Sequence, residues 1–305
     1  MNHKDLAIAL LVVTVWGANF TVIRLGLDGI PPLLLASIRF LLAAFPAVFF
    51  IRRPAAGLGH VIAYGLTVGV GQFGCLFYAI AIGMPAGVAS VALQSQVFFT
   101  FLFAAILLRE QVRPRQVAGL VLSLAGLYLV GNLSGRTAAV SPAALLLTLT
   151  AAAFWGISNI VVRRAATAAI ACGRRLDMLS LVVWSALIPP VPLFLLSLVF
   201  ESPAAIATTL ADLDGKSLFA VAYLAFGATL FGYGAWSSLL SRHPANRVAP
   251  LSLLVPVTGL ITARVVLAEH LTVTQWSGCL LVVAGLVVAS FGIPLRKRLF
   301  PSTSG

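Results

Sequence analysis

The chain has 305 residues, of which 60% are hydrophobic and only 9% are charged, and its net charge is +12. A soluble domain carries about 25% charged residues, so this composition excludes a soluble protein and predicts an integral membrane protein. Basic charge in a soluble protein would suggest nucleic acid. Here Lys and Arg lie at the ends of apolar segments, so the expected partner is the lipid bilayer and not nucleic acid.

Ten apolar segments follow one another along the chain, separated by short polar breaks. A bilayer core about 30 Å thick requires about 20 apolar residues in a helix. The first segment starts at Leu6 with no small-residue cleavage site behind it, which favours a retained helix over a signal peptide. The predicted fold class is an all-α integral membrane protein with ten transmembrane helices. They cover residues 5–25, 33–51, 59–82, 86–108, 114–131, 141–163, 177–200, 217–240, 246–268 and 273–293.

The distribution of basic residues predicts the orientation. If the N-terminus faces the cytoplasm, most of the 20 Lys and Arg residues lie in cytoplasmic loops. The acidic residues Glu201, Asp212 and Asp214 then fall in the one long outward loop, near 200–216. Both termini are therefore expected on the cytoplasmic side of a bacterial inner membrane, with residues 296–305 as a basic cytoplasmic tail.

Polar and aromatic side chains in the first, third and fourth segments are candidates for a binding site. Asn and Gln amides can bond the amino and carboxylate groups of a substrate without a net charge. The alternative is interhelical packing and hydrogen bonding. Trp16, Asn19 and Phe20 in 5–25 share a helical face by three- and four-residue spacing. Gln72 and Tyr78 in 59–82 and Gln94 and Phe98 in 86–108 form similar stripes.

Charged residues inside or at the ends of the segments have two interpretations each. Arg39 lies about two turns inside the second segment, where it could attract a substrate carboxylate; snorkelling to the interface or a structural hydrogen bond is favoured. Glu110 and Glu269 end the fourth and ninth segments. We expect them to bond nearby loop groups or Arg, rather than to act as a gate.

The sixth, eighth and ninth segments supply the second half of the candidate site. One face of the sixth segment matches the candidate face of the first, so the two faces could meet and line one cavity. An aromatic cavity with few polar groups suits an apolar or aromatic zwitterion, although most aromatic stripes pack or face lipid. The candidates are Trp155, Ser158 and Asn159 in 141–163, Tyr233 and Trp236 in 217–240, and Ser252 in 246–268.

The chain repeats itself. Trp16-Gly17 matches Trp155-Gly156, and Pro85-Ala86 matches Pro244-Ala245. Each half, 1–135 and 136–295, holds five segments, so the second half enters the membrane with the opposite orientation. Inverted repeats are typical of secondary transporters that bind substrate near the midplane between the halves. Four positions also recur at one constant offset: Glu110, Gln116, Gly119 and Gly126 as Glu269, Gln275, Gly278 and Gly285.

These short motifs occur in an order and spacing that resemble a known family across essentially the whole chain. Besides the two Trp-Gly pairs, the motifs are Arg39-Phe40, Leu107-Leu108-Arg109-Glu110, Leu267-Ala268-Glu269, and the Gln-x-x-Gly-x6-Gly pattern that opens the fifth and tenth segments. The chain is similar to the drug/metabolite transporter superfamily and, within it, to the ten-helix EamA-type exporters. The resemblance implies two inverted five-helix repeats around a central cavity and export of small metabolites, often amino acids. The aromatic amino-acid exporters look most similar.

No motif for hydrolysis, redox chemistry, phosphate binding or metal binding stands out, so we expect no enzyme, no metal and no cofactor. All eight acidic residues lie near segment ends or in loops, which predicts weak or absent proton coupling by a midplane carboxylate. The predicted function is export of small zwitterionic metabolites, including aromatic and apolar amino acids, by alternating access. The alternatives are a membrane sensor or assembly partner that does not transport, and a passive channel. The oligomeric state is not predicted.

Overall fold

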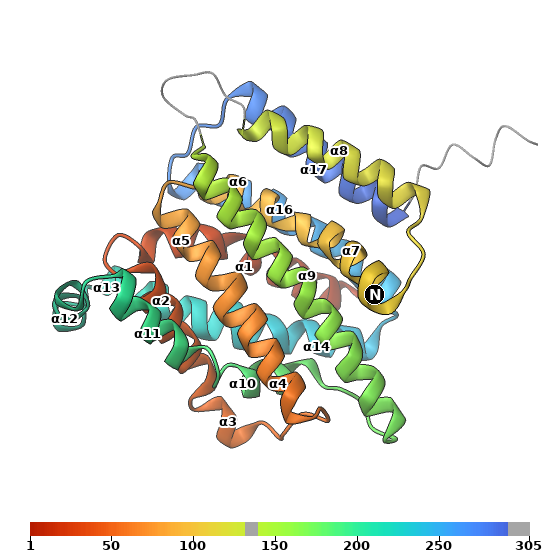
Figure 1. Cartoon of the computed structure of the whole chain (residues 1–305), viewed down its shortest axis with the longest axis horizontal. Coiled ribbons are helices and arrows are strands. Elements are labelled where there is room, and N and C mark those ends of the chain that lie inside the picture. The colour runs from red at the N-terminus through yellow and green to blue at the C-terminus, as the bar shows by residue number, and fades with distance from the viewer. Residues whose placement is uncertain (132–139, 292–305) are drawn as a thin grey trace, which may run out of the picture.

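The computed structural model describes residues 1–131 and 140–291, and the elements in these ranges are helical (Figure 1). Seven helices are long and apolar enough to cross a membrane, and a bent pair counts as an eighth. Two further apolar helices, Pro114–Val130 and Pro250–Val266, are shorter. The predicted all-α membrane fold is confirmed, and the protein is a multi-pass membrane protein. The count of ten spans stays a prediction, and the predicted tail, 296–305, lies outside the described residues.

The first half contains five helical segments, two of which join three helical pieces each. α1 starts where the Asn2 side chain accepts a hydrogen bond from the backbone N–H of Asp5. The elements are α1 (His3–Gly26), α2 (Pro32–Ala44), α3 (Ala47–Phe50), α4 (Leu58–Tyr64), the π-helical η1 (Gly65–Gly74), α5 (Cys75–Ala81), α6 (Ala86–Ala92), the 3₁₀-helical η2 (Leu93–Ser95), α7 (Gln96–Leu108) and α8 (Pro114–Gly131).

The second half repeats this order of elements and adds one short helix. The caps Asp177 and Asp214 start α10 and α13 by accepting backbone N–H groups. The elements are α9 (Pro142–Ala171), α10 (Met178–Ser185), α11 (Pro190–Phe200), α12 (Pro203–Ala211), α13 (Gly215–Ala222), the π-helical η3 (Tyr223–Phe231), α14 (Gly232–Arg242), α15 (Ala245–Val248), the 3₁₀-helical η4 (Ala249–Leu254), α16 (Val255–Val266) and α17 (Val273–Phe291).

Three expectations about the second half need correction. The segment predicted as one span, 177–200, consists of two helices, α10 and α11, bent by 43°, because Pro189 and Pro190 cannot continue the helical ladder. The sixth segment runs on to Ala171, so the loop expected near 164–176 is shorter. The loop expected near 200–216 contains α12.

Irregular turns occupy equivalent places in the two halves. The third segment of each half has a π-helical stretch in its middle, η1 and η3, and the fourth segment of each half has a 3₁₀ stretch, η2 and η4. π-helical turns are rare and often lie at functional sites. Irregular backbone at membrane depth is tolerated where protein or a cavity surrounds it. The repeat therefore extends from sequence to backbone geometry.

The glycine of each Trp-Gly pair is a site of close helix approach. A Cβ on Gly17 would collide with Thr258 and the backbone of Gly259 in α16, and a Cβ on Gly156 would collide with Phe99 and the backbone of Thr100 in α7. Small residues at such crossings let two helix backbones approach in a membrane. The first segment of each half thus packs tightly on the fourth segment of the other half.

Helices α8 and α17 lie side by side along one edge of the molecule (Figure 1). Gly119 packs on the backbone of Gly285 and Gly126 on that of Gly278, where added Cβ atoms would collide. Ser123 lies between these contacts and donates a hydrogen bond of 3.2 Å to the Val282 carbonyl. The glycines that recur in the fifth and tenth segments therefore pack on each other.

The two ends of the bundle are defined here by α1. The terminal side is the end at which α1 begins, where Asp5 contacts Arg242 and His243 at 2.8 Å each. The opposite side is the end at which α1 finishes, where Asp28 pairs with Lys216. Large apolar side chains such as Phe50, 80% exposed, cover the outer surface between these ends, as expected for a lipid-facing surface.

Candidate functional site

A cavity of about 370 Å³ lies between the two halves of the chain. Its walls come from α1, α2, α4, η1, α5, η2, α7, α9, α10, η3, α14, η4 and α16. The volume is in the range of small-molecule sites. Ten of the 13 predicted site residues line this cavity: Trp16, Asn19, Phe20, Gln72, Gln94, Trp155, Asn159, Tyr233, Trp236 and Ser252.

The other three predicted site residues are not among the lining residues. Tyr78 packs beside the hydrophobic core, and Phe98 packs with Phe101 at 6.4 Å between ring centres. Ser158 donates to the Trp155 carbonyl at 2.7 Å, so its hydroxyl bonds its own helix. The π-helical η1 precedes Tyr78 and the 3₁₀-helical η2 precedes Phe98, and both change the helical rotation between these residues and the lining residues Gln72 and Gln94.

Aromatic rings form one wall of the cavity around Trp16. Its ring lies 5.5 Å from that of Tyr233 and 5.3 Å from that of Trp236, centre to centre. Its indole N–H donates to the Ala228 carbonyl of η3 at 2.9 Å. Tilted aromatic pairs at these separations stabilise one another beyond simple burial. The wall is therefore an ordered apolar surface against which an aromatic or aliphatic side chain can pack.

Asn159 joins a hydrogen-bond network on the other side of the cavity. Its Nδ2 donates to Gln96 Oε1 at 2.8 Å and to Thr100 Oγ1 at 3.0 Å. The Thr100 hydroxyl also donates to the Gln96 carbonyl at 2.7 Å. This network ties α9 to α7, so the structure supports the packing interpretation of Asn159 besides its place in the cavity wall.

Two lining amides have buried oxygens without a protein partner among the described residues. They are Asn19 Oδ1 and Gln72 Oε1, and these residues are 6% and 4% exposed. A buried polar atom without a partner costs free energy, about 1–3 kcal/mol. Such atoms often mark places where a ligand makes the missing bond.

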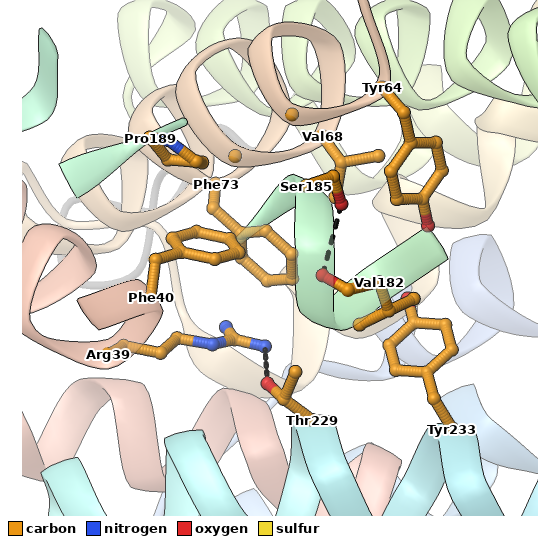
Figure 2. Close-up of a pocket in the computed structure, with 12 residues that line it drawn as sticks. Arg39, Phe40, Tyr64, Val68, Phe73, Val182, Ser185, Pro189, Thr229 and Tyr233 are labelled. Atoms are coloured by element: carbon orange, nitrogen blue, oxygen red, sulfur yellow. Dashed lines mark hydrogen bonds between the residues drawn. The ribbon is translucent and has the colours of Figure 1, made fainter. Parts of the chain in front are cut away.

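Arg39 lines both the cavity and a small side pocket, where Figure 2 shows its guanidinium beside Thr229. It is 2% exposed, so the expectation that it snorkels to the interface is wrong. Its Nη2 donates to Thr229 Oγ1 of η3 at 3.2 Å, and its Cζ lies 3.9 Å from the centre of the Phe73 ring. A side pocket of about 20 Å³ adjoins it. Burial of Arg39 follows from the helices around it, which apolar periodicity does not reveal.

Further lining residues carry little signal in the sequence. Most are apolar or weakly polar and look like ordinary core residues, and only Arg39 and Gln96 stand out as strongly polar positions inside predicted spans. The lining residues absent from the prediction are Arg39, Tyr64, Phe73, Leu76, Leu93, Gln96, Val162, Met178, Ala228, Ser237, Leu240 and Val255.

Exposure along the wall shows from which side the cavity is reached. The lining residues Asn19, Gln72 and Leu76, which are farther from the terminal side, are buried. Val162 in the second half of α9 is partly exposed, as is Met178 at the start of α10, and Leu240 near the end of α14 is 37% exposed. The cavity is therefore accessible from the terminal side.

Ionic contacts and helix caps hold the opposite side together. The Glu201 carboxylate accepts the N–H groups of Leu33 and Leu34 at the start of α2, and the Glu269 carboxylate accepts those of Ala86 and Gly87 at the start of α6, at 2.7 and 3.0 Å. Carboxylates at helix N-termini are stabilised by the helix dipole. These contacts join α2 and α6 to segments distant in the sequence.

Two exposed carboxylates have lowered pKa values. The hydrogen bond from Arg163 lowers the pKa of Glu110 on the terminal side. The hydrogen bond from Lys216, together with the charge of Arg24, lowers the pKa of Asp28 on the opposite side. Both carboxylates stay ionised at neutral pH, and neither is among the residues that line the cavity.

Within residues 1–131 and 140–291, no three His, Cys, Asp or Glu side chains come together as metal ligands. The predicted lack of metal and cofactor stays a prediction. The cavity offers amides, aromatic rings and one guanidinium. This chemistry suits binding of a small zwitterion rather than bond cleavage.

The sequence matches the EamA-like transporter family over residues 4–132 and 142–291. It is 46% identical to a probable amino-acid metabolite efflux pump of Salmonella typhimurium strain LT2, over 97% of this chain and 98% of that protein. It is 44% identical to a protein of the same name from Escherichia coli strain K12, over 98% and 99%. An uncharacterized inner membrane transporter of that strain, YedA, is 24% identical over 94% and 90%.

A crystal structure of another protein has the same fold. It superposes with a TM-score of 0.61 over 95% of this chain and 97% of its own, at 21% identity.

Proposed function

Because the chain belongs to the EamA-like transporter family, we propose that it exports small zwitterionic metabolites across the bacterial inner membrane. The substrates are amino acids, including those with aromatic and apolar side chains. The observation that carries this proposal is the cavity between the halves, with its aromatic wall around Trp16 and its buried amides. The names of the two relatives at 46% and 44% identity support the substrate class, and the name of the transporter YedA supports the membrane.

Transport proceeds by alternating access between two inverted halves, residues 1–135 and 136–295, around this fixed site. Both termini are cytoplasmic, as the excess of Lys and Arg on the terminal side indicates. The cavity reached from the terminal side is then open to the cytoplasm, and the described state is ready to load substrate for export. The protein carries out no reaction on the substrate.

Coupling to protons does not use a carboxylate of the binding cavity. No Asp or Glu is among its lining residues, so none can bind a proton and substrate in turn there. An imposed pH gradient at fixed substrate concentration is expected to change counterflow little. A strong dependence on the gradient would contradict this part of the proposal.

Counterflow in proteoliposomes tests the function. Purified protein is reconstituted with a high internal concentration of one unlabelled amino acid, and uptake of the labelled form is followed. Phenylalanine, tryptophan, methionine and threonine form the panel, with lysine and a sugar as controls. We expect counterflow of the aromatic and apolar amino acids, because the aromatic wall packs against apolar side chains.

Two variants connect the activity to the cavity. Trp16→Ala removes the centre of the aromatic wall, and Asn159→Ala breaks the network with Gln96 and Thr100. Both are expected to lose most counterflow, whereas Trp276→Ala on the outer helix α17, 39% exposed, is expected to keep it. Absence of exchange with every amino acid would favour a sensor or assembly partner. Uptake without stimulation by internal substrate would favour a channel.

A further inference from the structure

Arg39 is a buried cation surrounded mainly by aromatic rings. Its guanidinium carbon lies 3.9 Å from the centre of the Phe73 ring, 5.5 Å from that of Phe40 and 5.8 Å from that of Phe77. Figure 2 shows the Phe40 and Phe73 rings beside the guanidinium. Such rings attract a cation through their negative faces, but they supply no hydrogen-bond acceptor. The Thr229 hydroxyl accepts from Nη2, and Nε and Nη1 are buried without a protein partner among the described residues.

No carboxylate neutralises Arg39 within the part of the chain that the structure describes. The five ion pairs of this part join other groups, and the lining residues of the cavity include no Asp or Glu. An unpaired charge inside a membrane protein is costly, and it usually marks a substrate or ion pathway. The cavity therefore has a permanent positive charge and lacks a fixed anion.

Two amide oxygens in the same cavity lack hydrogen-bond donors within the described part of the chain. Asn19 Oδ1 and Gln72 Oε1 are buried acceptors that receive no hydrogen bond from the described residues. The guanidinium of Arg39, whose Nε and Nη1 have no acceptor among the described residues, and the two amide oxygens without a donor line one cavity. The carboxylate of an amino acid supplies acceptors and its ammonium group supplies donors, so a zwitterion meets both deficiencies at once.

The elements that carry these groups contact one another: α2 contacts η1 and η3, and η3 contacts α1. Arg39 bonds Thr229, and the Trp16 indole bonds Ala228, the adjacent residue of η3. Asn19 lies one helical turn after Trp16 on α1. Gln72 directly precedes Phe73, whose ring lies against the guanidinium. The side pocket beside Arg39, about 20 Å³, is too small for a carboxylate group, so an anion reaches Arg39 from the main cavity.

We infer that Arg39 binds the carboxylate of the transported amino acid and that the amide oxygens of Asn19 and Gln72 bind its ammonium group. This inference rests on the proposed function and adds a rule of selection. The substrate needs a free carboxylate and a free ammonium group. Lysine and amines bring an additional or uncompensated positive charge to a cavity that already holds Arg39, so they are excluded. Arginine guanidinium groups are well suited to this recognition of carboxylates.

Competition for phenylalanine counterflow by two analogues tests the rule on the unmodified protein. Phenylalaninamide keeps the ammonium group and lacks the carboxylate, and 3-phenylpropionate keeps the carboxylate and lacks the ammonium group. Loss of a charge-assisted hydrogen bond in a buried site corresponds to about tenfold or more in affinity. Phenylalaninamide is therefore expected to compete at least about tenfold more weakly than phenylalanine.

Variants identify the residues responsible. In Arg39→Gln, the preference for phenylalanine over phenylalaninamide is expected to fall to about twofold or less. In Asn19→Ala and Gln72→Ala, the preference for phenylalanine over 3-phenylpropionate is expected to fall. Arg24→Gln is the matched control, because Arg24 pairs with Asp28 at the protein surface, and it should keep both preferences. A purely structural role of Arg39 would lower the rate without changing these preferences.

The outcomes separate this inference from the proposed function. Phenylalanine counterflow together with equal competition by phenylalaninamide would overturn the assignment of Arg39 and leave the function standing. An unchanged preference in a folded Arg39→Gln variant would do the same. Lack of counterflow with every amino acid would overturn both. If Arg39→Gln does not fold, the competition measured on the unmodified protein still shows whether the substrate needs a free carboxylate.

Discussion

The two ends of the bundle contain the same local structure. Directly before Glu110 and Glu269, the left-handed residues Arg109 (φ 56°) and Ala268 (φ 53°) terminate α7 and α16. The backbone N–H of each glutamate then returns to a helical carbonyl at 3.3 Å, Glu110 to Ala104 and Glu269 to Ala263. This is the usual closure of a helix by a left-handed residue. The repeat therefore places two equivalent carboxylates at opposite ends of the molecule.

The partners of these carboxylates differ. Glu269 caps the first two residues of α6, Ala86 and Gly87. Glu110 pairs instead with Arg163, and its side chain is 47% exposed. The helix α6, which Glu269 caps, begins on the opposite side. The exposed pair of Glu110 and Arg163 lies on the terminal side, from which the cavity is accessible. The difference teaches that one sequence motif can hold one end closed while its copy leaves the other end open.

Alternating access in an inverted repeat exchanges the roles of the two ends. In the state that opens to the opposite side, we expect Glu110 to cap α15, which follows Pro244 as α6 follows Pro85. Glu269 is then expected to leave α6. The following predictions test this exchange, from the largest effect to the smallest.

Removal of the cap should shift the protein toward the state open on the opposite side. Glu269→Ala removes a carboxylate that accepts two backbone N–H groups, each about 1.5–3 kcal/mol for a charged acceptor. A cysteine at Leu76, in protein with Cys75, Cys172 and Cys279 replaced, is then expected to react about tenfold faster with an impermeant thiol reagent applied from the opposite side. Glu110→Ala is the matched control and should not raise this rate. Equal rates in both variants would contradict the comparison.

A larger side chain beside the Glu269 cap of α6 should also shift the protein toward the state open on the opposite side, with a smaller effect than Glu269→Ala. A Cβ on Gly87 would lie 3.2 Å from Glu269 Oε2 and 3.2 Å from the Cβ of Ala263. Gly87→Val is expected to cost about 1–3 kcal/mol by overpacking, and the labelling of the cysteine at Leu76 reports the shift. Gly59→Val, where a Cβ meets nothing within 4 Å, serves as the control. Faster labelling in the Gly59 variant alone would rule out the role of the α6 cap.

Loss of Glu110 should affect transport more than stability. In the described state Glu110 makes an exposed ion pair, and such pairs contribute little. Glu110→Gln is therefore expected to change the melting temperature slightly but to slow counterflow, because α15 loses its cap in the other state. Arg163→Gln removes the same ion pair and keeps the carboxylate, so it should retain counterflow. If both variants slow counterflow equally, the ion pair and not the cap is responsible.

The smallest expected effect concerns the pH dependence of the opposite side. The pKa of Asp28 is lowered by the hydrogen bond from Lys216 and by Arg24, so the unfolded chain binds a proton more readily than the folded one. The stabilisation by Asp28 is then fully present above its usual pKa, about 4, and is lost as the pH falls through the lower folded value. The melting temperatures of the natural protein and Asp28→Asn should differ by a constant small amount from pH 8 to 5 and converge below about pH 4. A difference that grows as the pH falls would contradict this sign.

Much of the candidate site could be predicted, because the face of α1 that carries Trp16 and Asn19 is regular. Three-residue spacing on a regular helix brings such side chains to one wall. Tyr78 and Phe98 are not among the lining residues, and η1 and η2, which precede them, change the rotation between consecutive residues. Arg39 was visible as an intramembrane charge, but its burial depends on Phe73 and Thr229, which belong to other segments.

The sequence by itself determined the membrane class, the helices and the internal repeat, because hydropathy and residue spacing are properties of neighbouring positions. The tertiary structure alone decided which glutamate caps a helix and which is exposed. Glu110 and Glu269 occupy equivalent positions of the repeat and follow the same helix closure, so this shared local structure does not distinguish them. Their partners come from segments more than 50 residues away, at separations of 53 for Arg163 and 183 for Ala86. Only the packing of the two halves determines which of these contacts forms.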